Sequence, residues 1–460
     1  MKQPIIGKVV LLFSLLFFIN ITIQGQNIPR TLYALNGSAQ TISKLNLETK
    51  EITQNILTVG EIPNRIITNN NMIYVVNSKP DNIMIINPAD DTNIKSVISL
   101  TEGSNPWAMA FINDTKAYVT NFNTDSISIV DLQNEKVIKS VYVGKAPEGI
   151  IVIGTKAYIA NTGYAGWGNP YKQATVAIVD TDADTVITSV NVPTNAQDFA
   201  LAPNGKLHVI CTGDYSNEFG KVAVIDIEAE TPAVVDTIVL GGSPGDIEIS
   251  TNGIGFCSAW GDGTNGFIYK YDAEADTVIN NSDNPILVGP NVSGLFYDKN
   301  ENSLWIPYMT AWGGDGFAQQ FSVNADSIIW TSDVLGNGTS AFTIVEPFVV
   351  SVEKNNLKPE RFYLSQNYPN PFNPTTTIKY TIPLLETLHV TSPQKNATSL
   401  LVQIKVYNVL GKEIATLVNE NQNPGTYELQ FDGTNLSSGI YYIQLKSNNF
   451  IQTRKMMLLK

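Results

Sequence analysis

Hydrophobic and polar residues follow a short repeating pattern in residues 117–150. Apolar residues alternate with polar ones or form short groups, and each group ends at Asn, Asp or Gly. This pattern is typical of short β-strands that are joined by tight turns. The stretch therefore predicts one antiparallel unit of four strands.

Copies of this unit fill the chain as far as Pro347, at intervals of about 40 to 50 residues. A four-stranded repeat of this length is the signature of a β-propeller, whose blades bury both faces against their neighbours. Seven copies can be counted, so the sequence predicts an all-β chain with a seven-bladed β-propeller over residues 27–348. One strand of each copy begins near the following residues: Tyr33, Tyr74, Tyr118, Tyr158, His208, Phe256 and Leu304.

The phase of the repeat predicts how the ring closes. The chain enters the first copy at Leu32, on the second strand of a blade, and residues 341–345 form a strand with no partners after it. Pairing this last strand with the first copy would cover two open sheet edges. We therefore expect one blade to combine three N-terminal strands with one C-terminal strand.

The segment Tyr118-Val119-Thr120-Asn121 resembles the hallmark of the YVTN family of β-propeller repeats, found in many surface-layer-like proteins. Seven-bladed propellers similar to this one include outer-surface cobalamin binders. The resemblance therefore adds a corrinoid to the candidate ligands, beside glycans and proteins.

Residues 1–26 resemble a secretory signal peptide. Lys2 and Lys8 precede an apolar run at 9–19, which is too short for a membrane span, and a polar stretch follows it. An uncleaved anchor is the alternative. No later stretch predicts a transmembrane segment, so we expect an exported protein.

Charge narrows the class of partner. The net charge is −13, and before Ser351 acidic residues outnumber basic ones by about two to one. A nucleic-acid binder needs a basic face. The sequence therefore argues against DNA or RNA as a ligand of the predicted propeller.

Candidate catalytic groups are scarce. His208 and His389 are the two histidines, so a Ser-His-Asp triad or a multi-histidine metal site lacks its parts. Cys211 and Cys257 fall in corresponding strands of neighbouring copies, out of register for a disulfide, and are expected to be buried thiols. Asp residues recur at strand ends, where such side chains close turns. These recurring residues are Asp131, Asp180, Asp226 and Asp272. We predict no catalytic residue, no metal ligand and no cofactor, although a divalent metal is not excluded.

Aromatic residues concentrate in the loop between the first two aligned strands of the last four copies. In the first three copies this loop is short and plain, as at residues 122–125. Aromatic side chains in glycine-rich loops favour recognition over packing, although filling gaps between blades is the alternative. The predicted ligand-binding residues are Tyr164, Trp167, Tyr171, Asp214, Tyr215, Trp260, Asp262, Tyr308, Trp312 and Asp315.

Strand direction places these long loops around one mouth of the predicted channel. Aromatic faces interleaved with carboxylates suit a sugar ring or a large planar ligand, and the acids would repel an anion. The first hypothesis is therefore a non-enzymatic recognition protein that binds a glycan, a corrinoid or a protein. A metal-dependent hydrolase or lyase and a structural surface-layer component are the alternatives.

The repeat stops after Pro347, and residues 349–361 are predicted to be a linker. The prolines that follow exclude a helix and a central strand, and several strand patterns come after them. Residues 362–460 resemble the type A C-terminal sorting domain of the type IX (Por) secretion system, an immunoglobulin-like sandwich. The matching residues are Asn367, Tyr368, Pro369, Asn370, Pro371, Phe372, Asn373, Pro374, Gly411, Gly439, Tyr441 and Tyr442.

The resemblance implies passage across the outer membrane by the type IX secretion machinery, to the cell surface or the medium. The domain would then be removed. Residues 384–400 are longer and more polar than this family leads us to expect. An accessory β module that stays attached for binding is the alternative.

Overall fold

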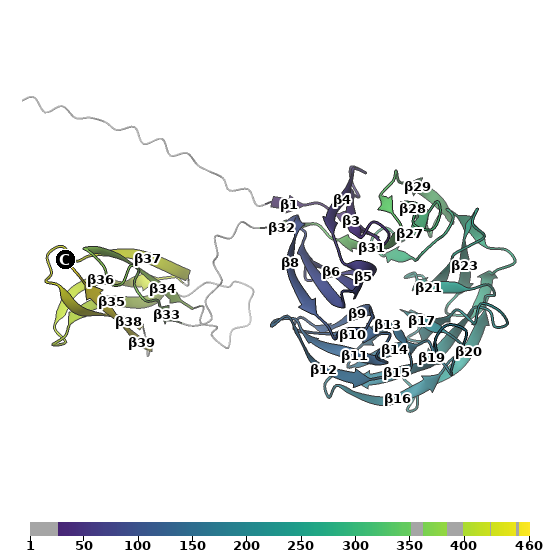
Figure 1. Ribbon diagram of the computed structural model, residues 1–460, viewed down its shortest axis with the longest axis horizontal. Helices are drawn as coiled ribbons and strands as arrows, with labels where there is room; N and C mark the ends of the chain where they lie inside the picture. The colour runs from purple at the N-terminus through teal and green to yellow at the C-terminus, as the bar shows by residue number, and fades with distance from the viewer. Residues whose placement is uncertain (1–25, 351–361, 384–398, 424, 448–449) are drawn as a thin grey trace, which may run out of the picture. The chain divides into compact units, whose positions relative to one another are not determined.

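The computed structural model describes residues 26–350, 362–383, 399–423, 425–447 and 450–460 (Figure 1). The chain divides into two compact units at residue 350. The predicted signal peptide, except for Gln26, and residues 351–361 of the predicted linker lie outside the described residues. Most of the polar insertion at 384–400 also lies outside them.

The unit that ends at Val350 is a ring of seven β-sheets, each containing four strands in antiparallel order, and this confirms the predicted seven-bladed propeller (Figure 1). From the innermost strand outward, the blades are β31 (Thr339–Val345), β2 (Thr31–Asn36), β3 (Thr41–Asn46), β4 (Ile52–Thr58); β5 (Glu61–Asn69), β6 (Met72–Lys79), β7 (Asn82–Asn87), β8 (Asp90–Ser99); β9 (Pro106–Asn113), β10 (Lys116–Asn121), β11 (Ser126–Asp131), β12 (Lys136–Tyr142); β13 (Pro147–Ile153), β14 (Lys156–Asn161), β15 (Thr175–Asp180), β16 (Thr185–Asn191); β17 (Ala196–Leu201), β18 (Leu207–Cys211), β19 (Lys221–Asp226), β20 (Ala233–Val239); β21 (Pro244–Ile249), β22 (Ile254–Ala259), β23 (Gly266–Asp272), β24 (Thr277–Asn280); and β26 (Phe296–Asp298), β27 (Ser303–Met309), β28 (Asp315–Ser322), β29 (Ser327–Thr331). Two short strands extend the last two blades: β25 (Ile286–Val288) pairs with β23, and β30 (Gly336–Asn337) pairs with β28.

Burial falls from the middle strands to the outer strand of a blade. All six residues of β2 are buried, as are five of six in β10 and β14, because neighbouring blades cover both faces of these strands. The outer strand β12 has no fully buried residue. This explains why apolar residues run consecutively in the middle strands instead of alternating. Each such side chain, once buried, contributes about 1.5 to 3 kcal/mol to stability.

The ring closes as the phase of the repeat predicts. Strand β31 pairs with β2 from Thr31↔Val345 to Asn36↔Thr339, so the first blade joins residues from both ends of the unit. Arg30 strengthens this closure, because its guanidinium lies 2.7 Å from Asp298 and 3.1 Å from Glu301 and Glu346.

A second clasp was not predicted from the sequence. Strand β1 (Gln26–Ile28) pairs with β32 (Phe348–Val350). Val349 and Val350, which the sequence pattern placed in the linker, therefore belong to a strand.

The recurring Asp side chains close turns, as predicted. The Asp131 carboxylate accepts the backbone N–H of Gln133 and Asn134 at 3.0 and 2.9 Å. Asp180, Asp226 and Asp272 repeat this arrangement at 2.8–3.1 Å. These turns follow the third strand of each blade and lie at the opposite end of the channel from the start of the innermost strands.

The described part of the C-terminal unit, from residue 362 onward, is a sandwich of two sheets. One sheet has the order β33 (Tyr363–Leu364), β34 (Thr375–Ile382), β37 (Gly425–Asp432), and the other β36 (Glu413–Gln422), β35 (Leu400–Asn408), β38 (Gly439–Ser447), β39 (Phe450–Leu458). Apolar side chains from both sheets form one core, in which Ile378, Val406 and Ile443 are fully buried. Strand β36 was missed from the sequence; the other long strands were predicted.

The sorting motif combines packing with exposure. Phe372 is buried, and its N–H donates to the carbonyl oxygen of Met457 at 2.9 Å. The Asn367 side chain is also buried and donates to Thr376 Oγ1 at 2.9 Å. Tyr368 between them is 82% exposed. The proline-rich entry is therefore fixed at two points and presents an aromatic ring to solvent.

Candidate functional site

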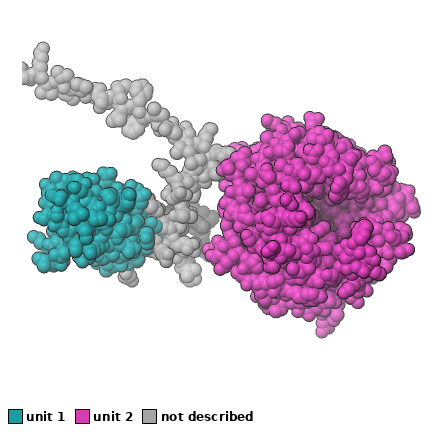
Figure 2. Space-filling view, viewed as in Figure 1, with its two compact units in different colours: residues 1–24, 351–460 teal, residues 25–350 magenta. Residues whose placement is uncertain are grey.

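The centre of the propeller contains a cavity of about 730 Å³. Figure 2 shows the hollow at the centre of this unit. The innermost strands of the blades start around the cavity, and the loops that follow the second strands of two blades reach it. Its volume lies within the range of about 300–1,000 Å³ that is usual for small-ligand sites.

A bulge near the start of the innermost strand directs side chains into this cavity. In β5 the register shifts between Pro63 and Arg65, and equivalent shifts occur in β9, β13, β17, β21 and β31. A bulge inserts one residue and re-aims its neighbours, and bulges are frequent beside functional sites. The residues at or just after the shifts that line the cavity are Asn64, Arg65, Trp107, Ala108, Glu148, Gln197, Asp198, Gly245, Asp246, Ser340 and Ala341.

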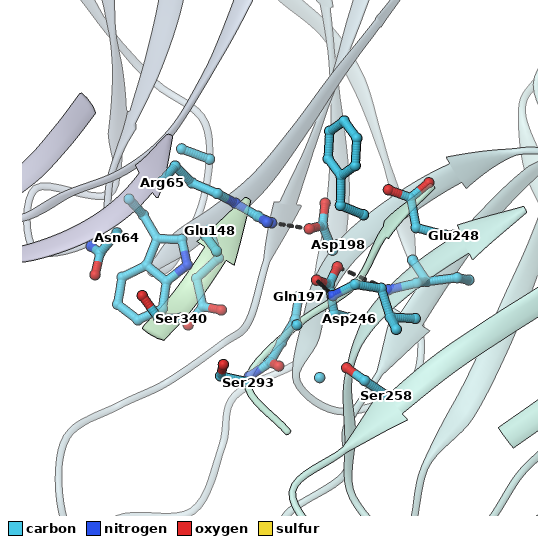
Figure 3. A pocket seen from close by; sticks show the side chains of 18 of the residues that line it. Asn64, Arg65, Glu148, Gln197, Asp198, Asp246, Glu248, Ser258, Ser293 and Ser340 are labelled. Atoms are coloured by element: carbon cyan, nitrogen blue, oxygen red, sulfur yellow. Dashed lines mark hydrogen bonds and ion pairs between the residues drawn. The ribbon is translucent and has the colours of Figure 1, made fainter. Parts of the chain in front are cut away.

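One ion pair crosses the cavity. Arg65 Nη2 contacts Asp198 Oδ2, and these residues come from the second and fifth blades of the ring (Figure 3). The Asp198 carboxylate also accepts a hydrogen bond from the backbone N–H of Phe199, at 2.9 Å. The pair is part-buried, with exposed side-chain fractions of 29% for Arg65 and 16% for Asp198. It therefore borders the space that a ligand would occupy.

Three further carboxyl groups share the cavity with this pair: Glu148, Asp246 and Glu248. Burial raises the pKa of Glu148 to about 8; Asp198 adds to the shift and Arg65 opposes it. Burial also raises the pKa of Glu248 to about 8 and that of Asp246 to about 7. Carboxyl groups with raised pKa values in a cavity are candidate functional groups.

The partners of these carboxyl groups differ. Asp246 accepts the backbone N–H of Leu295 at 2.8 Å and that of Ile247 at 3.0 Å. Glu148 is only 7% exposed, and no described residue makes a hydrogen bond or an ion pair with its carboxyl group. In Figure 3 its side chain points into the pocket.

Two of the ten predicted ligand-binding residues line the cavity, Tyr215 and Trp260. Tyr215 is 60% exposed and Trp260 is 37% exposed. Trp260 lies against Trp312, with ring centroids 5.4 Å apart, so the similar loops of the sixth and seventh blades contact each other through these side chains. Trp312 is 84% exposed.

The aromatic residues of the fourth blade form a separate cluster. Tyr164 lies 5.8 Å from Tyr171 and 5.7 Å from Phe122, and Phe122 stacks on Trp107 at 5.5 Å. This ladder connects two predicted residues to Trp107, which lines the cavity. Trp167 is 96% exposed and does not line the cavity.

The carboxylates of Asp214 and Asp262, which were predicted to bind ligand, accept hydrogen bonds from backbone N–H groups of their own loops. Asp214 accepts three backbone N–H groups, from Ser216, Asn217 and Glu218, at 2.6–2.9 Å, and these bonds lower its pKa to about 2. Asp262 accepts the N–H of Thr264 and Asn265 at 2.8 Å, which lowers its pKa. Both side chains therefore stabilise a loop conformation, and their role in ligand binding stays a prediction.

Tyr308 and Asp315 correct the predicted extent of the last loop. Both lie in strands, Tyr308 in β27 and Asp315 in β28, so the loop comprises residues 310–314. The Tyr308 ring stacks on Phe317, its cross-strand partner, at 5.1 Å. The sequence pattern located these two strands but not their ends beside the loop.

Sequence reasoning missed the charged residues of the cavity. Glu148, Asp198 and Asp246 lie within two residues of the Pro or Ala that begins an innermost strand, and Arg65 lies two residues after Pro63 in β5. A charged residue at this position, just after a turn and before an apolar strand, was the available signal. In the sequence such a charged residue cannot be distinguished from an ordinary turn residue, because only the closed ring shows that these residues of different copies lie together.

The remaining reactive groups are buried in the blades. Cys211 and Cys257 are free thiols, as predicted, and burial raises the pKa of each. His208 is fully buried and stacks on Tyr271, and burial lowers its pKa to about 4. Within the described ranges, no group of three or more His, Cys, Asp or Glu residues is arranged to hold a metal ion. The same ranges contain no helix with the length and apolarity of a membrane span.

Comparisons with known proteins address the tail and the scaffold separately. Residues 366–459 match the family described as the secretion system C-terminal sorting domain, which confirms the resemblance found in the sequence. No protein with a curated description matches the chain.

Among solved structures, hydrazine synthase of Kuenenia stuttgartiensis has a TM-score of 0.50 and 17% identity, over 61% of this chain and 88% of its own. A quinonprotein alcohol dehydrogenase-like protein from Bacteroides thetaiotaomicron has a TM-score of 0.50 and 15% identity, over 69% and 78%. At these identities the likeness supports the fold alone.

Proposed function

We propose that this protein, which carries a type IX secretion sorting domain and is secreted or displayed on the cell surface, is a non-enzymatic recognition protein. Its ligand is a small polar molecule, with a glycan as the first candidate. The propeller binds this ligand in the central cavity. The loop aromatics Tyr215 and Trp260 cover the mouth.

The observation that carries this proposal is the composition of the cavity wall. Trp107, Tyr215 and Trp260 supply flat apolar faces, and Asn64, Gln197, Ser293 and Ser340 supply hydrogen-bonding groups beside the carboxyl groups. A few convergent polar groups with aromatic faces are the usual make-up of a small-molecule site. Stacking contributes affinity, and hydrogen bonds to hydroxyl groups fix orientation.

The first prediction tests the mouth of the cavity. We expect calorimetry to detect binding of at least one of glucose, galactose, mannose or their β-linked disaccharides, and Trp260→Ala to weaken it about tenfold, since stacking is lost. Trp167→Ala is the matched control, because Trp167 is an exposed loop tryptophan outside the cavity. The free energy of unfolding of both variants should lie within about 1 kcal/mol of that of the parent protein.

Other outcomes separate the alternatives. Equal losses of affinity in the two variants would contradict a binding site at the mouth, and no binding of any saccharide, amine or corrinoid probe would contradict the proposal. Cyanocobalamin serves as the corrinoid probe in the same assay, and its binding in place of sugars would change the ligand class.

Acid–base catalysis is the second candidate function. The raised pKa values of Glu148, Asp246 and Glu248 favour it, since a protonated carboxyl group near neutral pH can act as a general acid. Release of reducing ends from a bound disaccharide, abolished by Glu148→Gln while binding persists, would favour this candidate.

A further inference from the structure

Carboxyl groups outnumber cationic groups in the wall of the central cavity. Four carboxyl groups, those of Glu148, Asp198, Asp246 and Glu248, face one guanidinium, that of Arg65. Tyr215 is the titratable group that lines the cavity from a loop. After the ion pair between Arg65 and Asp198 is counted, three carboxyl groups remain, and burial raises their pKa values to about 7–8, so near neutral pH each can exchange a proton for a cation.

Glu148 is the incomplete part of this wall. Asp198 has Arg65 as its partner, and Asp246 accepts two backbone N–H groups. The Glu148 carboxyl group has no hydrogen bond or ion pair to any described residue, although the residue is only 7% exposed. The Glu148 carboxyl oxygens are not fully enclosed and reach the space of the cavity, where a bound cation or a bound proton can satisfy them.

We propose that the central cavity binds the protonated amine of its ligand, with Glu148 as the counter-ion. This inference rests on the proposed function and specifies the chemical class of the ligand. Trp107 lines the same cavity from the neighbouring blade, and an indole face attracts a cation that lies over it. Arg65 already neutralises Asp198, so the amine approaches the side of the cavity that Arg65 leaves acidic.

The raised pKa of Glu148 gives the binding reaction a measurable signature. Without ligand, the carboxyl group holds a proton at neutral pH, because burial raises its pKa to about 8. A cation that replaces this proton must release it to the solution. Amine binding should therefore release protons and should tighten as the pH rises towards 8.

An amino sugar, a polyamine and a lysine side chain carry the same amine chemistry, and matched probes distinguish them. The probes are glucosamine against N-acetylglucosamine, spermidine, and acetyl-lysine amide against its N-ε-acetyl form. Calorimetry of the full chain at pH 7, in two buffers of different ionisation enthalpy, measures affinity and proton release together. We expect at least one amine to bind at least tenfold more tightly than its uncharged analogue or, for spermidine, than glucose.

Glu148→Gln should reduce amine affinity at least tenfold and remove most of the proton release. Glu230→Gln is the matched control, since Glu230 is exposed on a turn of the fifth blade. Glu148→Asp, which keeps the charge, should retain part of the affinity, and melting curves verify that each variant folds.

Equal affinity for an amine and its uncharged analogue overturns the inference, as does binding that Glu148→Gln leaves unchanged. If neutral saccharides bind and no amine binds more tightly, the proposed function survives and the amine inference fails. If neither binds, both fail.

Discussion

Glu148 links the stability of the propeller to pH. Its folded pKa, about 8, lies above the ordinary value of 4.5, so the folded state binds a proton that the unfolded state releases. This contribution is fully present below about pH 4.5 and is lost as the pH rises through about 8. The propeller should therefore melt at lower temperature as the pH rises from about 6 to 9.

Glu148→Gln should flatten this dependence. Removing the titrating group should stabilise the protein at about pH 9 by roughly 1–3 kcal/mol relative to the parent, with little difference near pH 5. Calorimetric melting across this range measures the effect. Asp246 and Glu248 titrate in the same window, so part of the slope should remain. An unchanged slope in the variant would show that groups other than Glu148 cause the pH dependence.

Single residues differ in how far the sequence predicted them. The turn role of Asp131 depends on two residues that follow it, so a local pattern was sufficient. The pairing of Arg65 with Asp198 joins positions 133 residues apart, and only the closed ring brings them together. Without the ring, these residues have the appearance of ordinary turn residues.

Arg30 stabilises the closure of the ring, which is called the seam below and is the place where β31 pairs with β2. Arg30 is 12% exposed at its side chain and Asp298 is 2% exposed, so removing the guanidinium leaves a buried carboxylate without its main partner. We expect Arg30→Ala to destabilise the propeller by about 2–4 kcal/mol in denaturant unfolding. Glu61→Ala is the control, because it breaks an exposed pair with Lys79 at 4.0 Å and should cost less than about 1 kcal/mol. Similar losses in both variants would show that Arg30 does not hold the seam.

Element prediction succeeded where a strand belongs to the repeat. Strand β31 was assigned to the first blade because the phase of seven copies required it. Strands β1 and β32 contain three residues each and have no pattern of their own. They exist because each is the partner of the other, which a local pattern cannot reveal.

At the scale of the whole molecule, export and recognition reside in separate units. The two units have separate cores, and the sorting-domain match covers residues 366–459. Deleting residues 362–460 should therefore leave a folded propeller that stays in the periplasm, whereas Glu148→Gln in the full chain should be exported normally. Cell fractionation with limited proteolysis of each fraction measures both results. Surface display of the truncated chain would refute the assignment of export to this domain.

The bulged innermost strands have a consequence for how such proteins diversify. Each of six blades contributes its own inserted residue to the cavity, and each insertion lies in a separate copy of the repeat. The Asp-closed turns within the blades lie at the far end of the channel, so a substitution at one bulge leaves them intact. Gene duplicates can therefore exchange ligands one blade at a time while the scaffold and its export route are inherited unchanged.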